Sequence, residues 1–116
     1  LKKILIENLS HLGCILNVHP NIGSKLKLSA ISPDRQTAIC VQMGNISNLS
    51  TDILKLNDAY EFKELKKAII FLPTKKTEQA FKSGNCAAFE RVLERKDFYT
   101  RHLNLPACLC GIEVVN

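Results

Sequence analysis

Apolar residues in the first part of the chain recur at helical spacing and then at strand spacing. Leu5, Leu9 and Leu12 fall on one side of a helix that ends at Gly13. A short apolar run follows, and two alternating segments then flank a turn that contains Pro33, which indicates a β-hairpin. The pattern predicts one helix and three strands, over residues 2–12, 14–18, 25–31 and 37–43.

A second amphipathic helix is expected over residues 48–60. Leu49, Leu56 and Tyr60 share one of its sides. Asp52 is expected in its first turn, where the helix dipole favours an acidic side chain.

The remaining segments complete a single α/β domain. Residues 68–72 form a continuous apolar run, as in a strand buried on both faces. A helical turn at 77–82, a helix capped by Asn85, a basic irregular stretch and a closing strand at 107–115 follow. The order αβββαβαβ predicts one domain over residues 1–116, with a mixed sheet of about five strands flanked by helices.

Composition and charge narrow the class of protein. The 116 residues are 46% hydrophobic and 23% charged, which is ordinary for a globular domain. No apolar run approaches the ~18–20 residues of a membrane span, so no membrane partner is expected. The net charge of +5 favours binding to polyanions. Because the chain begins with Leu, we expect it to be part of a longer protein.

The five cysteines are an odd number and lie mostly in apolar runs. We interpret them as reduced thiols of a cytoplasmic or nuclear protein rather than a disulfide framework. Cys108 and Cys110 have the spacing of a metal clip, but no second pair follows and the histidines are scattered. Core packing in the last strand is the preferred interpretation, and no metal site is predicted.

The predicted strand at 37–43 carries the candidate catalytic residues. Alternation places Cys40 and Gln42 on one face of this strand, with Ile39 and Val41 on the other. An acid two residues before Lys, Glu or Gln is how many nucleases hold Mg²⁺ beside a scissile phosphate. The acid position here is a cysteine.

That segment and its surroundings resemble the PD-(D/E)xK nuclease superfamily, and most closely type II restriction endonucleases of the Bgl and Bam kind. The resemblance covers most of residues 15–113. It is carried by the strand sequence Cys-Val-Gln-Met-Gly-Asn-Ile, the helix sequence Thr-Asp-Ile-Leu-Lys-Leu, the apolar strand ending in Pro-Thr-Lys, and the later segments Asn-Cys-Ala-Ala-Phe-Glu-Arg-Val and Cys-Gly-Ile-Glu. The resemblance implies a restriction-endonuclease-like core.

Carried over residue by residue, the resemblance implies a degenerate catalytic site. Ser29 or Ala30 stands where the first acid is expected, Cys40 stands at the second, and Gln42 retains the third position. Glu7 sits where some relatives keep an accessory acid. Because Mg²⁺ requires hard oxygen ligands, usually including a carboxylate, a hydroxyl and a thiol are poor replacements.

Three functions remain open at this point. The leading one is a pseudoenzyme that serves DNA binding or assembly in a larger protein, without a cofactor. The second is an active Mg²⁺-dependent endodeoxyribonuclease with a migrated metal site that uses Glu7 or Asp34 beside Gln42. The third is a dimerisation or scaffold module that contacts other protein subunits or a second copy of itself. Cys40 is a poor candidate nucleophile because no histidine lies close to it in sequence.

Basic residues supply candidate contacts to double-stranded DNA, because phosphate contacts give affinity that is independent of base sequence. A solvated protein surface is the alternative interpretation for each of these groups. The candidates are Lys25, Lys27, Lys75, Lys76, Arg91 and Arg95.

Overall fold

The structure is a computed structural model that describes residues 2–19, 27–62, 65–80 and 87–113. Its centre is a five-stranded mixed sheet in the order β1-β2-β3-β4-β5. The strands are β1 (Ile15–Val18), β2 (Leu28–Ile31), β3 (Thr37–Val41), β4 (Lys67–Pro73) and β5 (Ala107–Ile112). Strands β1 to β3 pair antiparallel, and β3 to β5 pair parallel. The α/β class with a mixed five-stranded sheet is therefore confirmed.

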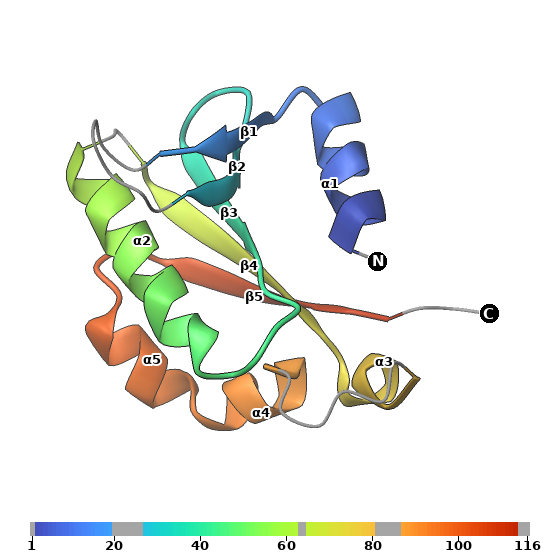
Figure 1. Ribbon diagram of the computed structural model, residues 1–116. Coiled ribbons are helices and arrows are strands. Elements are labelled where there is room, and N and C mark those ends of the chain that lie inside the picture. Colours follow the sequence, from blue (N-terminus) through green and yellow to red (C-terminus); the bar gives the residue numbers. More distant parts are fainter. Residues whose placement is uncertain (1, 20–26, 63–64, 81–86, 114–116) are drawn as a thin grey trace.

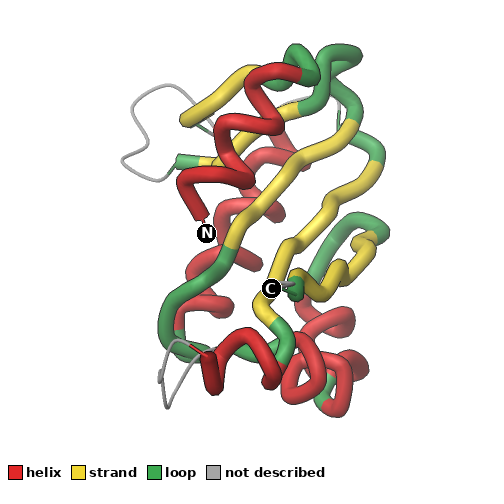
Figure 2. The backbone as a smooth tube through the Cα atoms, turned by 90° about the vertical axis from the view of Figure 1, so that its right-hand side faces the viewer, coloured by secondary structure: helices red, strands yellow, loops and turns green. Residues whose placement is uncertain are grey.

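Helices lie on both faces of this sheet (Figure 1). Helix α1 lies on one face, which we call the α1 face, and Figure 2 views the molecule from that side. Helices α2, α4 and α5 lie on the opposite face, the α2 face, while α3 follows the end of β4. The helices span Lys2–His11 (α1), Asn48–Phe62 (α2), Lys75–Ala80 (α3), Phe89–Glu94 (α4) and Lys96–His102 (α5).

The larger apolar cluster fills the space between the sheet and the α2 face helices. Leu49 and Leu56 of α2 are buried there at 1% and 0% exposure, as the helical spacing predicts. Ala68, Ile70 and Leu72 reach the same cluster from alternate positions of β4. Alternate burial of β4 means that only one of its faces is fully covered, so the prediction of a strand buried on both faces is only partly correct.

The smaller cluster lies under α1. Leu9 of α1 packs with Ala30, Ile39 and Val41, so alternate residues of β3 serve opposite faces of the sheet. The α1 helix is followed by Gly13 at a φ of 86°, a left-handed conformation that glycine adopts without strain. The predicted end of this helix is confirmed, but Leu12 is 72% exposed and does not join the cluster.

Three other local predictions were wrong. Asp52 is the fifth residue of α2 rather than a first-turn residue, and it is buried at 5% exposure. Tyr60 is 43% exposed, although the preceding Ala59 is fully buried in the larger cluster. The predicted irregular stretch after α4 contains α5, whose Tyr99 packs on the larger cluster together with Leu103, the residue that follows the helix.

The last strand also differs from the prediction. Ala107 and Leu109 pack on the larger cluster, so Cys108 and Cys110 face the other side of the sheet. Cys108 is exposed and Cys110 is half-buried, because the α1 helix packs on β1 to β3 and Phe71 of β4. The interpretation of Cys108 as a core residue was wrong. Asn85, the predicted cap, lies outside the described residues, and α4 begins at Phe89 with Ala88 in the cap position.

Candidate functional site

A polar cavity of about 280 Å³ opens at the carboxyl end of β3. Helix α1, the β2–β3 hairpin and α2 contribute its walls. It brings together the three positions that the resemblance assigns to the catalytic site, Ser29, Cys40 and Gln42. The other lining residues are Lys2, Ile6, Asn17, Lys27, Leu28, Val41, Asp52 and Lys55. We call this site the Asp52 cavity.

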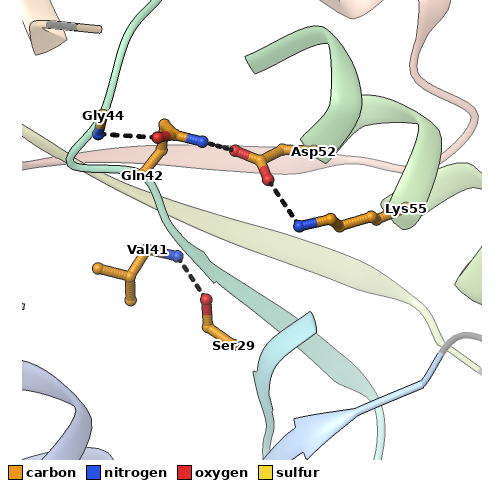
Figure 3. A network of polar contacts seen from close by, with 6 residues as sticks. All are labelled: Ser29, Val41, Gln42, Gly44, Asp52 and Lys55. Carbon is orange, nitrogen blue, oxygen red and sulfur yellow. Dashed lines mark hydrogen bonds and ion pairs between the residues drawn. The ribbon is translucent and has the colours of Figure 1, made fainter. Parts of the chain in front are cut away.

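Gln42 and Asp52 form the centre of the site (Figure 3). The Gln42 side-chain amide donates a hydrogen bond to Asp52 Oδ2 at 2.5 Å. The Gly44 backbone N–H donates to Gln42 Oε1 at 2.8 Å, which fixes the orientation of the amide. Lys55 lies one turn beyond Asp52 on α2, with its Nζ 3.5 Å from Asp52 Oδ1. Both carboxylate oxygens therefore have partners from the protein.

Burial is the main influence on the Asp52 carboxyl. It raises the pKa of Asp52 above its ordinary value, while the hydrogen bond from Gln42 and the charges of Lys55 and Lys2 oppose the shift. The aspartate lies within reach of two cations and is still harder to ionise than a carboxyl in water. The Asp52 carboxyl and the lysine side chains are therefore the charged groups that an entering ligand meets.

Cys40 is unsuited to nucleophilic chemistry. It is 2% exposed, and burial together with the Asp52 carboxylate raises its pKa to about 12. Since the thiolate is the reactive form of cysteine, this side chain is a neutral, buried thiol at physiological pH. The expectation that Cys40 is a poor nucleophile agrees with this environment.

Ser29 holds the hairpin together beside the cavity. Its hydroxyl accepts a hydrogen bond from the Val41 backbone N–H at 3.0 Å (Figure 3). Residue 29 therefore completes the pairing of β2 with the end of β3, and its oxygen is engaged in that contact. The neighbouring candidate, Ala30, is buried under α1 and faces away from this site.

Positive charge dominates the cavity wall. Three lysines line it, and Asp52 is the one acidic residue among the described lining residues. Lys2 comes from α1, Lys27 from the start of the hairpin and Lys55 from α2. Each comes from a different element, so the fold rather than a local run of sequence brings the three cations together.

The two acids proposed for a migrated metal site lie elsewhere. Glu7 is exposed on α1 and does not line the cavity, although its neighbour Ile6 does. Asp34 accepts hydrogen bonds from the Ser32 hydroxyl at 2.6 Å and the Gln36 backbone N–H at 3.0 Å, in the turn that precedes β3. It lies at the opposite end of β3 from Gln42. Within the described ranges, no group of three or more His, Cys, Asp or Glu side chains is placed to hold a metal ion.

The predicted DNA contacts are spread over two parts of the molecule. Lys27 lines the Asp52 cavity, and Lys25 lies outside the described residues. Lys75 and Lys76 are exposed at the start of α3, at the same end of the sheet as Gln42, but they do not line the cavity.

The two arginines are farther along the chain. Arg91 Nη1 lies 2.9 Å from Glu78 Oε1, a buried carboxylate, so part of its charge is used within the protein. Arg95 is exposed at the end of α4.

Sequence reasoning missed Asp52, Lys2 and Lys55 as members of the site. A signal for Asp52 was present, since it lies three residues after Leu49 and four before Leu56, on the buried side of α2. The contribution of Lys2 depends on how α1 packs across the sheet, which no local pattern encodes.

Comparison with known proteins assigns no family. No family model matches the sequence, and no curated protein matches it either. In the described part of the chain, no helix has both the length and the apolar character needed to cross a membrane.

Proposed function

We propose that the protein is a catalytically inactive nuclease-like domain that binds the phosphate backbone of double-stranded DNA at the Asp52 cavity, as part of a longer protein or complex. The observation that carries the proposal is the set of three lysines around a single, hydrogen-bonded carboxylate, in the cavity that also holds Ser29, Cys40 and Gln42, the positions that the resemblance assigns to the catalytic site. A site arranged in this way attracts a phosphodiester through charge, without a metal ion as an intermediary.

The dimensions of the cavity agree with a small anionic group. Its volume of about 280 Å³ lies just below the range of about 300–1,000 Å³ typical of small-molecule sites. One phosphate group of a backbone fits a cavity of this size, while the rest of the duplex lies across the outer surface. Lys75 and Lys76, at the same end of the sheet, are candidates for contacts to neighbouring phosphates.

The Asp52 carboxylate is a poor metal ligand in this arrangement. Its two oxygens are occupied by the Gln42 amide and the Lys55 ammonium group. A divalent cation would have to displace both partners and approach three lysines. These contacts favour anion binding over the migrated metal site of an active nuclease.

Binding to a labelled DNA duplex, measured by fluorescence anisotropy over a series of salt concentrations, tests the proposal. We expect Lys27→Gln to weaken binding. It should also reduce the magnitude of the negative slope of log K against log[salt] by about one, because one phosphate contact is lost. Lys66→Gln is the matched control, since Lys66 is exposed beside Gln36, at the other end of β3. Equal slopes for the two variants would contradict the proposed site.

Two further measurements separate the alternative functions. Nicking of supercoiled plasmid in Mg²⁺ that is abolished by Asp52→Asn or Glu7→Ala would establish an active nuclease instead. Sedimentation that shows a dimer indifferent to DNA, together with no binding in the anisotropy series, would establish a scaffold module.

A further inference from the structure

Cys108 and Cys110 form a pair of thiols on β5, apart from the Asp52 cavity. They alternate with Ala107 and Leu109, which pack on the larger cluster, so both thiols lie on the α1 face of the sheet. Cys108 is exposed, and Cys110 is half-buried. Their sulfur atoms are 3.9 Å apart, and neither cysteine is in a disulfide.

This separation matches the spacing of two thiolates on a tetrahedral metal ion. Zn²⁺ binds cysteine sulfur at about 2.3 Å, and a tetrahedral angle then places two sulfur ligands about 3.8 Å apart. The observed distance of 3.9 Å is therefore close to the spacing that such an ion requires.

Charge repulsion between the two sulfur atoms is the second consideration, because the pair lies at contact distance. Two neighbouring thiolates repel each other, and a divalent cation placed between them removes this repulsion.

We propose that Cys108 and Cys110 form a two-thiolate binding site for a thiophilic divalent cation such as Zn²⁺. Binding forms two metal–sulfur bonds and releases one proton from each thiol to solvent, with no change of oxidation state. Two ligand positions of the tetrahedral ion remain for water or for another pair of thiolates. Because β5 is the last strand in the sheet order, a second copy of the chain can supply that pair.

Titration of the fully reduced protein with Cd²⁺, a spectroscopic substitute for Zn²⁺, tests the site. We expect wild-type protein to develop the ultraviolet charge-transfer band of thiolate-bound Cd²⁺, and a large excess of Zn²⁺ to weaken the band by competing for the same thiolates. The double variant Cys108→Ser/Cys110→Ser should lose the band. Cys14→Ser is the matched control, because Cys14 is also free and half-buried, and it should retain the band.

The single variant Cys108→Ser provides a second readout, because this exposed position tolerates a polar side chain without loss of the fold. It should also lose most of the band. The endpoint of the titration gives the number of ions per chain, and sedimentation gives the oligomeric state. One ion per monomer or one ion per dimer would each support the thiolate site, and the difference would identify what completes it. A band that is absent in wild-type protein, or that persists in the double variant, would overturn the proposal.

Discussion

The Gln42 amide and the Asp52 carboxylate form a hydrogen bond of 2.5 Å between the end of β3 and the second turn of α2. The Gly44 N–H, which can only donate, orients the amide so that its nitrogen faces the acid. Gln42 stands at the third catalytic position of the resemblance, but here it joins strand to helix. A Cβ at residue 44 would lie 3.0 Å from Gln42 Oε1, so glycine also preserves this contact sterically.

Replacement of Asp52 by asparagine should change the pH dependence of stability. Burial raises the pKa of Asp52 above its ordinary value of 3.8, so the folded state holds this proton more tightly than the unfolded state. The free energy of unfolding of the wild type should therefore fall relative to Asp52→Asn as the pH rises above about 3.8 and through the folded-state pKa. Urea unfolding of both proteins from acidic to neutral pH measures the difference.

Asp34→Asn is the control for that experiment, because the pKa shift of Asp34 has the opposite sign. The Ser32 hydroxyl and the Gln36 backbone N–H lower the pKa of this exposed carboxyl. Wild-type protein should therefore lose stability relative to Asp34→Asn as the pH falls through the folded-state pKa of Asp34. A stability difference for Asp52→Asn that stays constant with pH would show that Asp52 is ionised as easily as an exposed acid.

Alkylation should distinguish the cysteines sharply. With a pKa of about 12, only about one Cys40 thiol in 10⁴ is ionised at pH 8, and the residue is also buried. We expect iodoacetamide to modify the exposed Cys108 at least about 100-fold faster than Cys40 in the folded protein, as measured by peptide mass spectrometry. In urea the two rates should become similar. Rapid modification of Cys40 in the native state would contradict the buried, neutral thiol.

Two leucines on α2 provide a paired test of the core. Leu56 is fully buried and Leu54 is 63% exposed, although they are two residues apart. Leu56→Ala should lower the free energy of unfolding by about 2–5 kcal/mol, because it leaves a cavity in the larger cluster. Leu54→Ala should change it by less than about 0.5 kcal/mol. Denaturant unfolding of both variants provides the comparison. Equal losses of unfolding free energy would contradict the orientation of α2 in which Leu56 faces the core and Leu54 faces solvent.

Much of the fold followed from local periodicity, since alternation identified the hairpin and helical spacing identified the buried side of α2. Errors arose where burial depends on distant neighbours. Cys108 lies in an apolar run, but α1 packs on β1 to β3 and Phe71, so the thiol is exposed. The α5 helix was missed because its apolar spacing is short and lies among charged residues.

The candidate site was only partly predictable for the same reason. Strand alternation correctly placed Cys40 and Gln42 together, because two residues on one strand share a face. Asp52 was expected to interact with the helix dipole, whereas its side chain accepts a hydrogen bond from the Gln42 amide, ten residues earlier in the chain. Lys2 enters the cavity from a helix at the far end of the sequence, so only the tertiary structure places it there.

The unequal division of the core has a consequence for hydrogen exchange. Helix α1 is held by the smaller cluster, so it can detach while the packing between the sheet and α2 remains intact. Its amides should therefore exchange with deuterium sooner than those of β3 and β4. Each such opening carries Lys2 away from the cavity, so the affinity of the site for anions is linked to the local unfolding of one short helix.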